Sequence, residues 1–173
     1  MTIRGTGTVT PAMKAADIVP ALKTRRMDRL SIWSVMAATL ALRNSSIDLG
    51  TLDRSRVAIV CGTGLGCIEL TEAAVASVLA NTGGKCDPVL FPETLSNAPG
   101  AHLARFYGIT GPNITVSTGE MAQQLATLLV EAGEADLAIV IQGDEATPTL
   151  RKWFHAARLP EPPEGCTAFV MTS

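Results

Sequence analysis

The chain has 173 residues, the length of a single domain that can bury a core of its own. A formal net charge of −2 gives no general electrostatic basis for nucleic-acid binding, and no apolar run reaches the ~18 residues that a membrane span needs. The hydrophobic content of 47% is high for a soluble chain and indicates surface reserved for a partner. The N-terminus lacks the apolar segment of a signal peptide, so we expect a cytoplasmic protein.

The side chains that bind metals or act as nucleophiles are scattered. The four cysteines form no C-x-x-C pair, and the two histidines lie far apart, so we expect neither a metal nor a cofactor. Cys67, near a predicted helix start, is the only candidate for a reactive thiol. The other cysteines are Cys61, Cys86 and Cys166. Of these, Cys61 and Cys166 fall in apolar strand segments and are predicted core residues. Lys23, Arg25, Arg26 and Arg29 form a short basic cluster, interpreted as the solvated start of a helix.

The first half of the chain predicts two strands and two helices. Residues 2–10 alternate β-formers with glycine and predict an opening strand. Asp28 can cap a helix that runs to about Arg43, with one apolar face formed by Leu30, Trp33, Ala37, Leu40 and Ala41. Residues 57–61 are continuously apolar, which is typical of a strand buried on both faces of a parallel sheet. Residues 68–79 predict a helix.

The second half continues the alternation of helices and strands. Residues 81–92 predict a loop, 97–107 a short helix, 114–117 a buried strand, and 120–132 a helix closed by Gly133. Residues 137–141 and 167–171 predict two more strands, separated by an irregular or helical excursion at 147–159. The expected order βαβααβαββ gives an α/β domain with a mostly parallel, five-stranded sheet and flanking helices.

The turn G-T-G-L-G-C at residues 62–67 follows a predicted strand and precedes a predicted helix, as a dinucleotide-binding loop would. That fingerprint requires glycine at the first, third and sixth positions and an acidic residue about 20 positions later. Here the sixth residue is Cys67 and a loop follows. We interpret the segment as a tight turn that needs small residues.

Several motifs occur in an order that resembles the N-terminal half of the β-ketoacyl synthases in the thiolase-like superfamily. They are G-T-G-T-V-T-P at 5–11, R-R-M-D-R-L at 25–30, A-I-V-C-G-T-G-L-G at 58–66, F-P-E-T-L-S-N-A at 91–98, G-P-N-I-T-V-S-T at 111–118, G-E-A-D-L-A at 133–138 and Q-G-D-E at 142–145. The resemblance implies that residues 1–173 form one thiolase-like half-domain. It also implies that 111–118 leads to the position of the nucleophilic cysteine.

Glu120 stands at that position, and a carboxylate cannot form the acyl thioester that condensation requires. Met121 and Gln123 replace the small residues expected next, and the segment between residues 11 and 25 is shorter than the family's. The chain ends where the family continues into a second half with two catalytic histidines. Neither His102 nor His155 matches those motifs, so no catalytic residue is assigned. Glu120 is interpreted either as a charge at a helix N-terminus or as a functional carboxylate.

The resemblance implies a partner subunit without condensing activity, similar in role to a chain-length factor, in polyketide or fatty-acid-type biosynthesis. The expected partners are a second copy or a ketosynthase subunit, with an acyl carrier protein as a further candidate, and neither nucleic acid nor membrane. The interface expected is the strand before the nucleophile position and the apolar helix after it, namely Asn113, Ile114, Thr115, Val116, Ser117, Leu125 and Leu129. Two alternatives stay open: a decarboxylase or acyl-transfer enzyme that uses Glu120 with a partner chain, and a homodimeric binding or structural protein.

Overall fold

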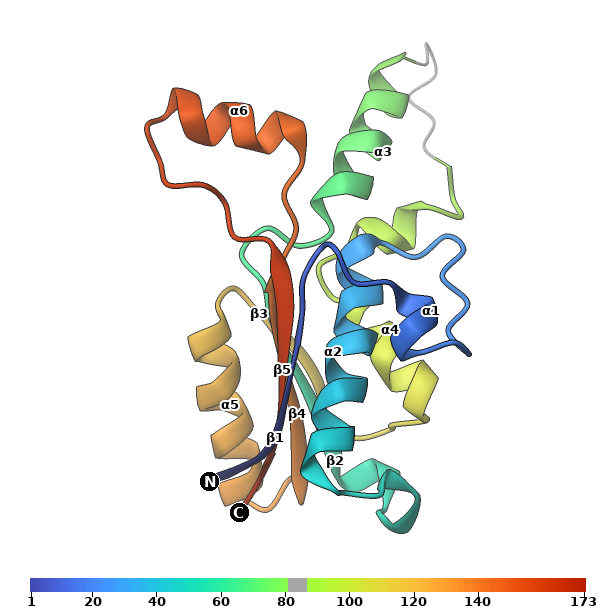
Figure 1. The fold of residues 1–173 in the computed structure, drawn as a ribbon, viewed down its shortest axis with the longest axis vertical. Coiled ribbons are helices and arrows are strands. Elements are labelled where there is room, and N and C mark those ends of the chain that lie inside the picture. The colour runs from blue at the N-terminus through green and yellow to red at the C-terminus, as the bar shows by residue number, and fades with distance from the viewer. Residues whose placement is uncertain (81–86) are drawn as a thin grey trace.

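A five-stranded sheet forms the centre of the molecule in a computed structural model that describes residues 1–80 and 87–173 (Figure 1). Across the sheet the strands are β1 (Thr2–Val9), β5 (Gly165–Thr172), β4 (Leu137–Asp144), β2 (Val57–Gly62) and β3 (Asn113–Val116). β2 pairs in parallel with β3 and β4, whereas β5 pairs antiparallel with β4 and β1. Only β5 therefore runs against the other described strands, and the mostly parallel five-stranded sheet is confirmed.

Helices cover both faces of the sheet and extend beyond one end of it (Figure 1). On one face lie α1 (Ala15–Ile18), α2 (Arg29–Ser45) and α4 (Ala98–Tyr107), and on the other lies α5 (Gly119–Glu131). α3 (Ile68–Ala80) and α6 (Pro148–Ala156) lie past the end of the sheet. Short 3₁₀ turns occur at Leu49–Thr51, Arg54–Arg56 and Phe91–Thr94, the last of which is η3.

The long helix α2 forms as its sequence predicts. The Asp28 carboxylate caps it by accepting hydrogen bonds from the backbone N–H groups of Leu30 (2.7 Å) and Ser31 (3.3 Å). Four of the five residues of the predicted apolar face are buried, and Leu40 is half-buried. The helix ends at Ser46, which adopts a left-handed conformation (φ 58°).

The core has two layers, one on each face of the sheet. Side chains of β2 alternate between them, so that Ile59 packs under α2 and α4 while Val60 packs under α5. Every residue of β2 is buried, as expected for a strand with parallel neighbours on both sides. The layer under α5 is the smaller one and is rich in alanine: Ala58, Ala122, Ala126, Ala135 and Ala138.

Some predictions need correction. The predicted buried strand at residues 114–117 is β3, which lies at the edge of the sheet and contains no buried residue. The short helix α1 was not predicted, whereas the excursion at 147–159, predicted as irregular or helical, contains the helix α6. Of the predicted loop at 81–92, residues 81–86 lie outside the described part. Along the described chain, no helix combines the length and apolar character needed to cross a membrane.

Candidate functional site

Glu120 lies in the first turn of α5. Thr118 caps this helix, because its hydroxyl accepts a hydrogen bond from the backbone N–H of Met121 (3.2 Å). The Glu120 side chain is exposed, and its Oε1 accepts a hydrogen bond from Nε2 of Gln124 (3.3 Å) one turn later. A carboxylate here is stabilised by the helix dipole and is also accessible to a second protein. Both interpretations of Glu120 fit this position.

The turn before α5 is held tightly between the ends of β2 and β4. Nε2 of Gln142 donates a hydrogen bond to the carbonyl oxygen of Gly119 (2.7 Å). A Cβ atom on Gly62 would lie 2.4 Å from the carbonyl oxygen of Thr118, and one on Gly119 would lie 2.6 Å from Cδ of Gln142. Glycine is therefore required at position 62, where the close atoms are backbone, whereas a side chain at position 119 would displace Gln142. The close approach at Gly62 fixes the start of α5 on the sheet.

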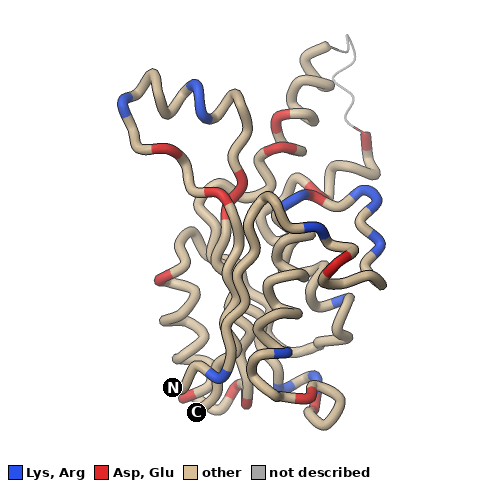
Figure 2. The backbone as a smooth tube through the Cα atoms, in the orientation of Figure 1, with Lys and Arg blue, Asp and Glu red and all other residues tan. Residues whose placement is uncertain are grey.

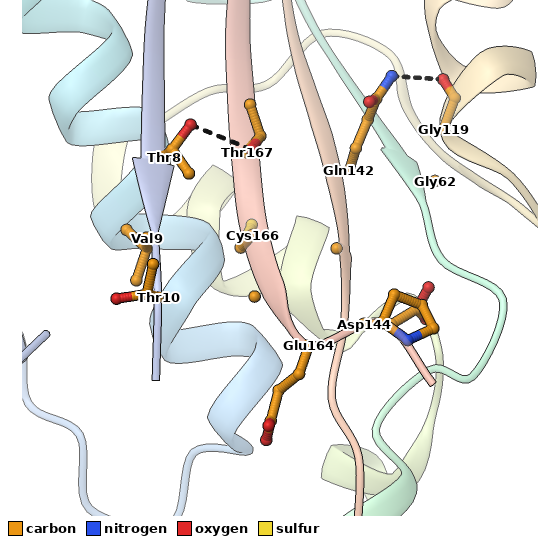
Figure 3. A pocket seen from close by; sticks show the side chains of 13 residues that line it. Thr8, Val9, Thr10, Gly62, Gly119, Gln142, Asp144, Glu164, Cys166 and Thr167 are labelled. Atoms are coloured by element: carbon orange, nitrogen blue, oxygen red, sulfur yellow. Dashed lines mark hydrogen bonds between the residues drawn. The ribbon is translucent and has the colours of Figure 1, made fainter. Parts of the chain in front are cut away.

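A cavity of about 370 Å³ lies beside this turn, where several strands end (Figure 3). Its walls include residues of β1, β2, β4 and β5, among them Thr8, Gln142 and Asp144, together with Gly119 and with Glu164, which precedes β5. The carboxyl ends of parallel strands are the usual location of ligand sites in α/β proteins. Glu120 does not belong to the lining, so the cavity and the predicted nucleophile position are neighbours rather than one pocket.

The glycine-rich turn after β2 binds a carboxylate of the protein itself. Oδ1 of Asp144 accepts hydrogen bonds from the Thr63 hydroxyl (2.6 Å) and from the N–H groups of Gly64 (2.9 Å) and Leu65 (2.7 Å). Successive backbone N–H groups of this kind bind phosphate in other proteins. Here Asp144 satisfies them, which supports the interpretation of the segment as a structural turn.

The described cysteines are all buried. Cys61 and Cys166 belong to the core, as predicted. The Cys67 thiol donates a hydrogen bond to the carbonyl oxygen of Leu95 (3.4 Å), and burial, together with the nearby Asp28 carboxylate, raises its pKa. A high pKa leaves little thiolate, so Cys67 is a poor nucleophile. Cys86 lies outside the described residues, and within those residues no cluster of three or more His, Cys, Asp and Glu side chains could hold a metal ion.

The structure brings together two buried acids that sequence reasoning did not connect. Asp28 and Glu145 are 1% and 0% exposed, where the starts of α2 and α3 meet the end of β4. Burial raises the pKa of both carboxyls, and that of Glu145 to about 7, because desolvation penalises the charged form. The two residues are far apart in the sequence, and the only signal was the Q-G-D-E motif at 142–145.

The two histidines do not form a pair. His102, on α4, has its Nε2 2.7 Å from Oε2 of Glu93, and Nη2 of Arg105 lies 3.2 Å from its Nδ1. Since the guanidinium must donate, Nδ1 accepts and the Nε2–H group donates to Glu93. His155 lies exposed on α6, beyond the end of the sheet (Figure 1).

The predicted interface residues lie on one side of the molecule. On β3, Asn113 is exposed and Ile114, Thr115 and Val116 are half-buried, while Ser117 follows the strand and is exposed. On α5, Leu125 and Leu129 are half-buried against the small core layer, and the more exposed apolar residues are Met121 (46%) and Leu128 (61%). Charged residues are sparse along α5, which carries Glu120 at its start and Glu131 at its end (Figure 2).

A second apolar surface was missed by the sequence analysis. None of the residues of α3, all of which the structure describes, is buried. Val75 (52%), Leu79 (81%) and Phe91 (55%) are widely exposed, and they line a groove of about 310 Å³ between α3 and η3. The apolar sequence of α3 predicted a helix, but the same sequence would suit a helix inside a core.

Comparisons with known proteins agree with this fold. The profile of the β-ketoacyl synthase N-terminal domain matches residues 10–171. A 3-oxoacyl-[acyl-carrier-protein] synthase 2 of Vibrio cholerae serotype O1 is 29% identical over 140 residues, which cover 78% of this chain and 34% of the relative. The chain thus spans about a third of the length of this relative.

Two solved structures share the fold at low sequence identity. The ishigamide ketosynthase/chain length factor superimposes with a TM-score of 0.79 and 22% identity, over 94% of this chain and 48% of that one. The structure of a type II polyketide synthase acyl-carrier protein in complex with its ketosynthase gives a TM-score of 0.78 and 17% identity. The match covers 99% of this chain and 62% of the matched chain. With a matching profile over nearly its whole length and a thiolase-like sheet, the chain belongs to the β-ketoacyl synthase family, in the region of its N-terminal domain.

Proposed function

We propose that this chain is a non-condensing β-ketoacyl-synthase-like subunit, and that residues 1–173 act as one N-terminal domain beside an active ketosynthase. Its role would be that of a chain-length factor in polyketide or fatty-acid-type biosynthesis in the cytoplasm. The observation that carries the proposal is Glu120, a carboxylate at the position that the 111–118 motif assigns to the nucleophilic cysteine. A carboxylate there cannot carry the growing chain as a thioester, and the described cysteines are buried.

The proposed contact with the ketosynthase uses β3 and α5. β3 is an edge strand, and its outer backbone groups have no strand partner in the described sheet. Such an edge is suited to pairing with a strand of a second chain. Next to it, Met121 and Leu128 offer exposed apolar area.

An acyl carrier protein is the second proposed partner. Lys23, Arg25 and Arg26 are exposed before α2, and in the described structure no carboxylate lies within 4.0 Å of their charged groups. Unpaired cations at a surface suit an acidic protein partner. One of the structural relatives is itself a ketosynthase in complex with its acyl-carrier protein.

Reconstitution with the condensing ketosynthase of the same source tests the proposal. We expect co-expression to give a stoichiometric complex, and condensing activity in the complex but not in this chain alone. A ketosynthase that is equally active and equally specific for chain length without this chain would contradict the proposed role. Decarboxylation or acyl transfer by the isolated chain that is lost in Glu120→Gln would favour the enzyme alternative. A homodimer that does not bind the ketosynthase would favour a separate binding protein.

A further inference from the structure

The N-terminal half of the helix α3 makes several polar contacts with the body of the molecule. The backbone N–H of Glu69 donates to Oε1 of Glu145 (2.7 Å), and the Thr147 hydroxyl donates to Oε1 of Glu72 (2.7 Å). The Thr71 hydroxyl lies 3.2 Å from the carbonyl oxygen of Thr94. Because no α3 side chain is buried, these polar contacts and the η3 packing fix the helix.

The hydrogen bond from Glu69 connects α3 to a buried acid pair, Asp28 and Glu145. Oδ1 of Asp28 accepts hydrogen bonds from two N–H groups of α2, whereas its Oδ2 is buried and accepts from no N–H or hydroxyl group of the described residues. The Glu145 side chain is its hydrogen-bonding neighbour. One proton on Oε2 of Glu145 would donate to Oδ2 of Asp28 and leave Oε1 free to accept from Glu69. A buried carboxylate pair that shares a proton in this way satisfies all of its oxygens.

Few positive charges surround the pair. From α2, Nε of Arg29 lies 3.4 Å from Oε2 of Glu145, but the same guanidinium also lies 3.3 Å from Glu69 of α3 and 3.4 Å from Glu164 before β5. Two further groups face the site: the Cys67 thiol, which stays neutral, and Glu93 of η3, which is paired with His102. With every carboxyl ionised, Arg29 alone would face Asp28, Glu69, Glu145 and Glu164, of which Glu164 is also paired with Arg151.

We propose that the proton shared by Asp28 and Glu145 holds the first turn of α3 against the body, and that loss of this proton loosens that turn. Ionisation would place a second negative charge beside Asp28 in a site without solvent, and separation of the two carboxylates relieves the repulsion. Since Oε1 of Glu145 accepts from the backbone N–H of Glu69, its displacement breaks that hydrogen bond and loosens the first turn of α3. The position of α3, and with it the exposed groove between α3 and η3, then depends on pH.

The sign of the effect follows from the pKa of Glu145, which is raised from 4.5 in the unfolded chain to about 7 in the folded one. Below the unfolded value both states are protonated, and the contribution of the pair to folding is complete. As the pH rises, the unfolded chain loses this proton before the folded chain does, and this ionisation stabilises the unfolded state relative to the folded state. Stability therefore falls between the two values, and the loss is complete once the pH exceeds about 7.

Tryptophan fluorescence provides a local measurement. The chain has two tryptophans, and Trp33 lies under Arg29, whose guanidinium carbon is 5.1 Å from the ring centre. In a Trp153→Phe background Trp33 is the only reporter. We expect a reversible change in its emission between pH 5 and 9 with a midpoint near 7. Amide exchange of α3, corrected for intrinsic pH dependence, should rise over the same interval.

Three variants separate the acid pair from other titrating groups. Glu145→Gln keeps an acceptor for Glu69 and a donor for Asp28 and should abolish the transition. Asp28→Asn keeps the helix cap but removes the neighbouring charge, and should lower the midpoint by about one pH unit or more. The matched control, Glu69→Gln, removes an exposed carboxylate at Arg29 and should keep the transition.

An unchanged transition in Glu145→Gln or Asp28→Asn would assign the titration to another group and overturn the proposal. So would the absence of any change in Trp33 emission and α3 exchange between pH 5 and 9. Because these measurements use the chain alone, their outcome does not depend on the proposed ketosynthase partner.

Discussion

At the scale of single residues, the clearest constraints come from glycines that bring two backbones together. Gly5 and Gly7 of β1 face α2 directly. A Cβ atom on Gly5 would lie 2.3 Å from the carbonyl oxygen of Ala41, and one on Gly7 would lie 2.3 Å from that of Ala37. The G-x-G pattern of the opening strand therefore has a packing origin. It allows β1 to lie against the long helix, with Val9 in the core beyond it.

Gly7→Ala should destabilise the fold by about 1–3 kcal/mol, because the added methyl group meets main-chain atoms that cannot move without shifting α2. The control is Thr6→Ala, an exposed position in the same strand, where the cost should stay below ~1 kcal/mol. Chemical denaturation measures both free energies of unfolding. Equal stability of the two variants would show that β1 and α2 are not in contact.

Glu120 can be tested by two substitutions that differ in what they restore. Glu120→Gln removes a charge at the start of α5 and should cost at most about 1 kcal/mol, because the side chain is exposed. Glu120→Cys places a thiol at a helix N-terminus, where its pKa falls. We still expect no condensation by this variant alone, since Met121 and Gln123 follow it and no histidine pair faces it in the described chain. An assay of condensation with acyl and malonyl thioesters measures this. Condensing activity gained by Glu120→Cys would contradict the non-condensing role.

At the scale of elements, the sequence was informative wherever a local signal and burial agreed. α2 has a capping acid and a continuous apolar face, and β2 has an apolar run with parallel neighbours, so both were predicted within a few residues. β3 has the same apolar character, yet it lies at the edge of the sheet. Its position depends on strand order, which no local pattern encodes. α3 shows the same limit, because an apolar helix predicts burial whether this chain or another supplies the cover.

The exposed side of α5 gives the prediction at this scale. Leu128→Lys should weaken self-association or ketosynthase binding at least tenfold, because a charge would be buried where an apolar side chain is 61% exposed in the single chain. Its melting temperature should hardly change. Ala101→Lys, on α4 at the opposite face of the sheet, adds the same charge and should leave assembly intact. Sedimentation over a concentration series measures the dissociation constants, and equal values for the two variants would exclude α5 from the interface.

At the scale of the whole molecule, the two faces of the sheet are covered unequally. α1, α2 and α4 enclose one face with a large core layer, whereas among the described helices only α5 covers the other. The sequence pointed to this imbalance through the apolar residues of α5, but it could not locate the buried acid pair. Asp28 looked like an ordinary helix cap and Glu145 like the end of a motif. Only the packing of α2, α3 and β4 brings them together and removes them from water.

The imbalance leads to the last prediction, which concerns assembly. An edge strand beside a helix with exposed apolar side chains is a surface that a second chain can cover. Pure protein should therefore scatter light with a mass of at least twice the 18.1 kDa of the chain, and pairing across a two-fold axis would place β3 beside its mate. Leu128→Lys should return the mass to that of one chain. A wild-type protein that stays monomeric and well behaved at micromolar concentration would show that a single chain tolerates this surface, and the β3–α5 interface would lose its physical basis.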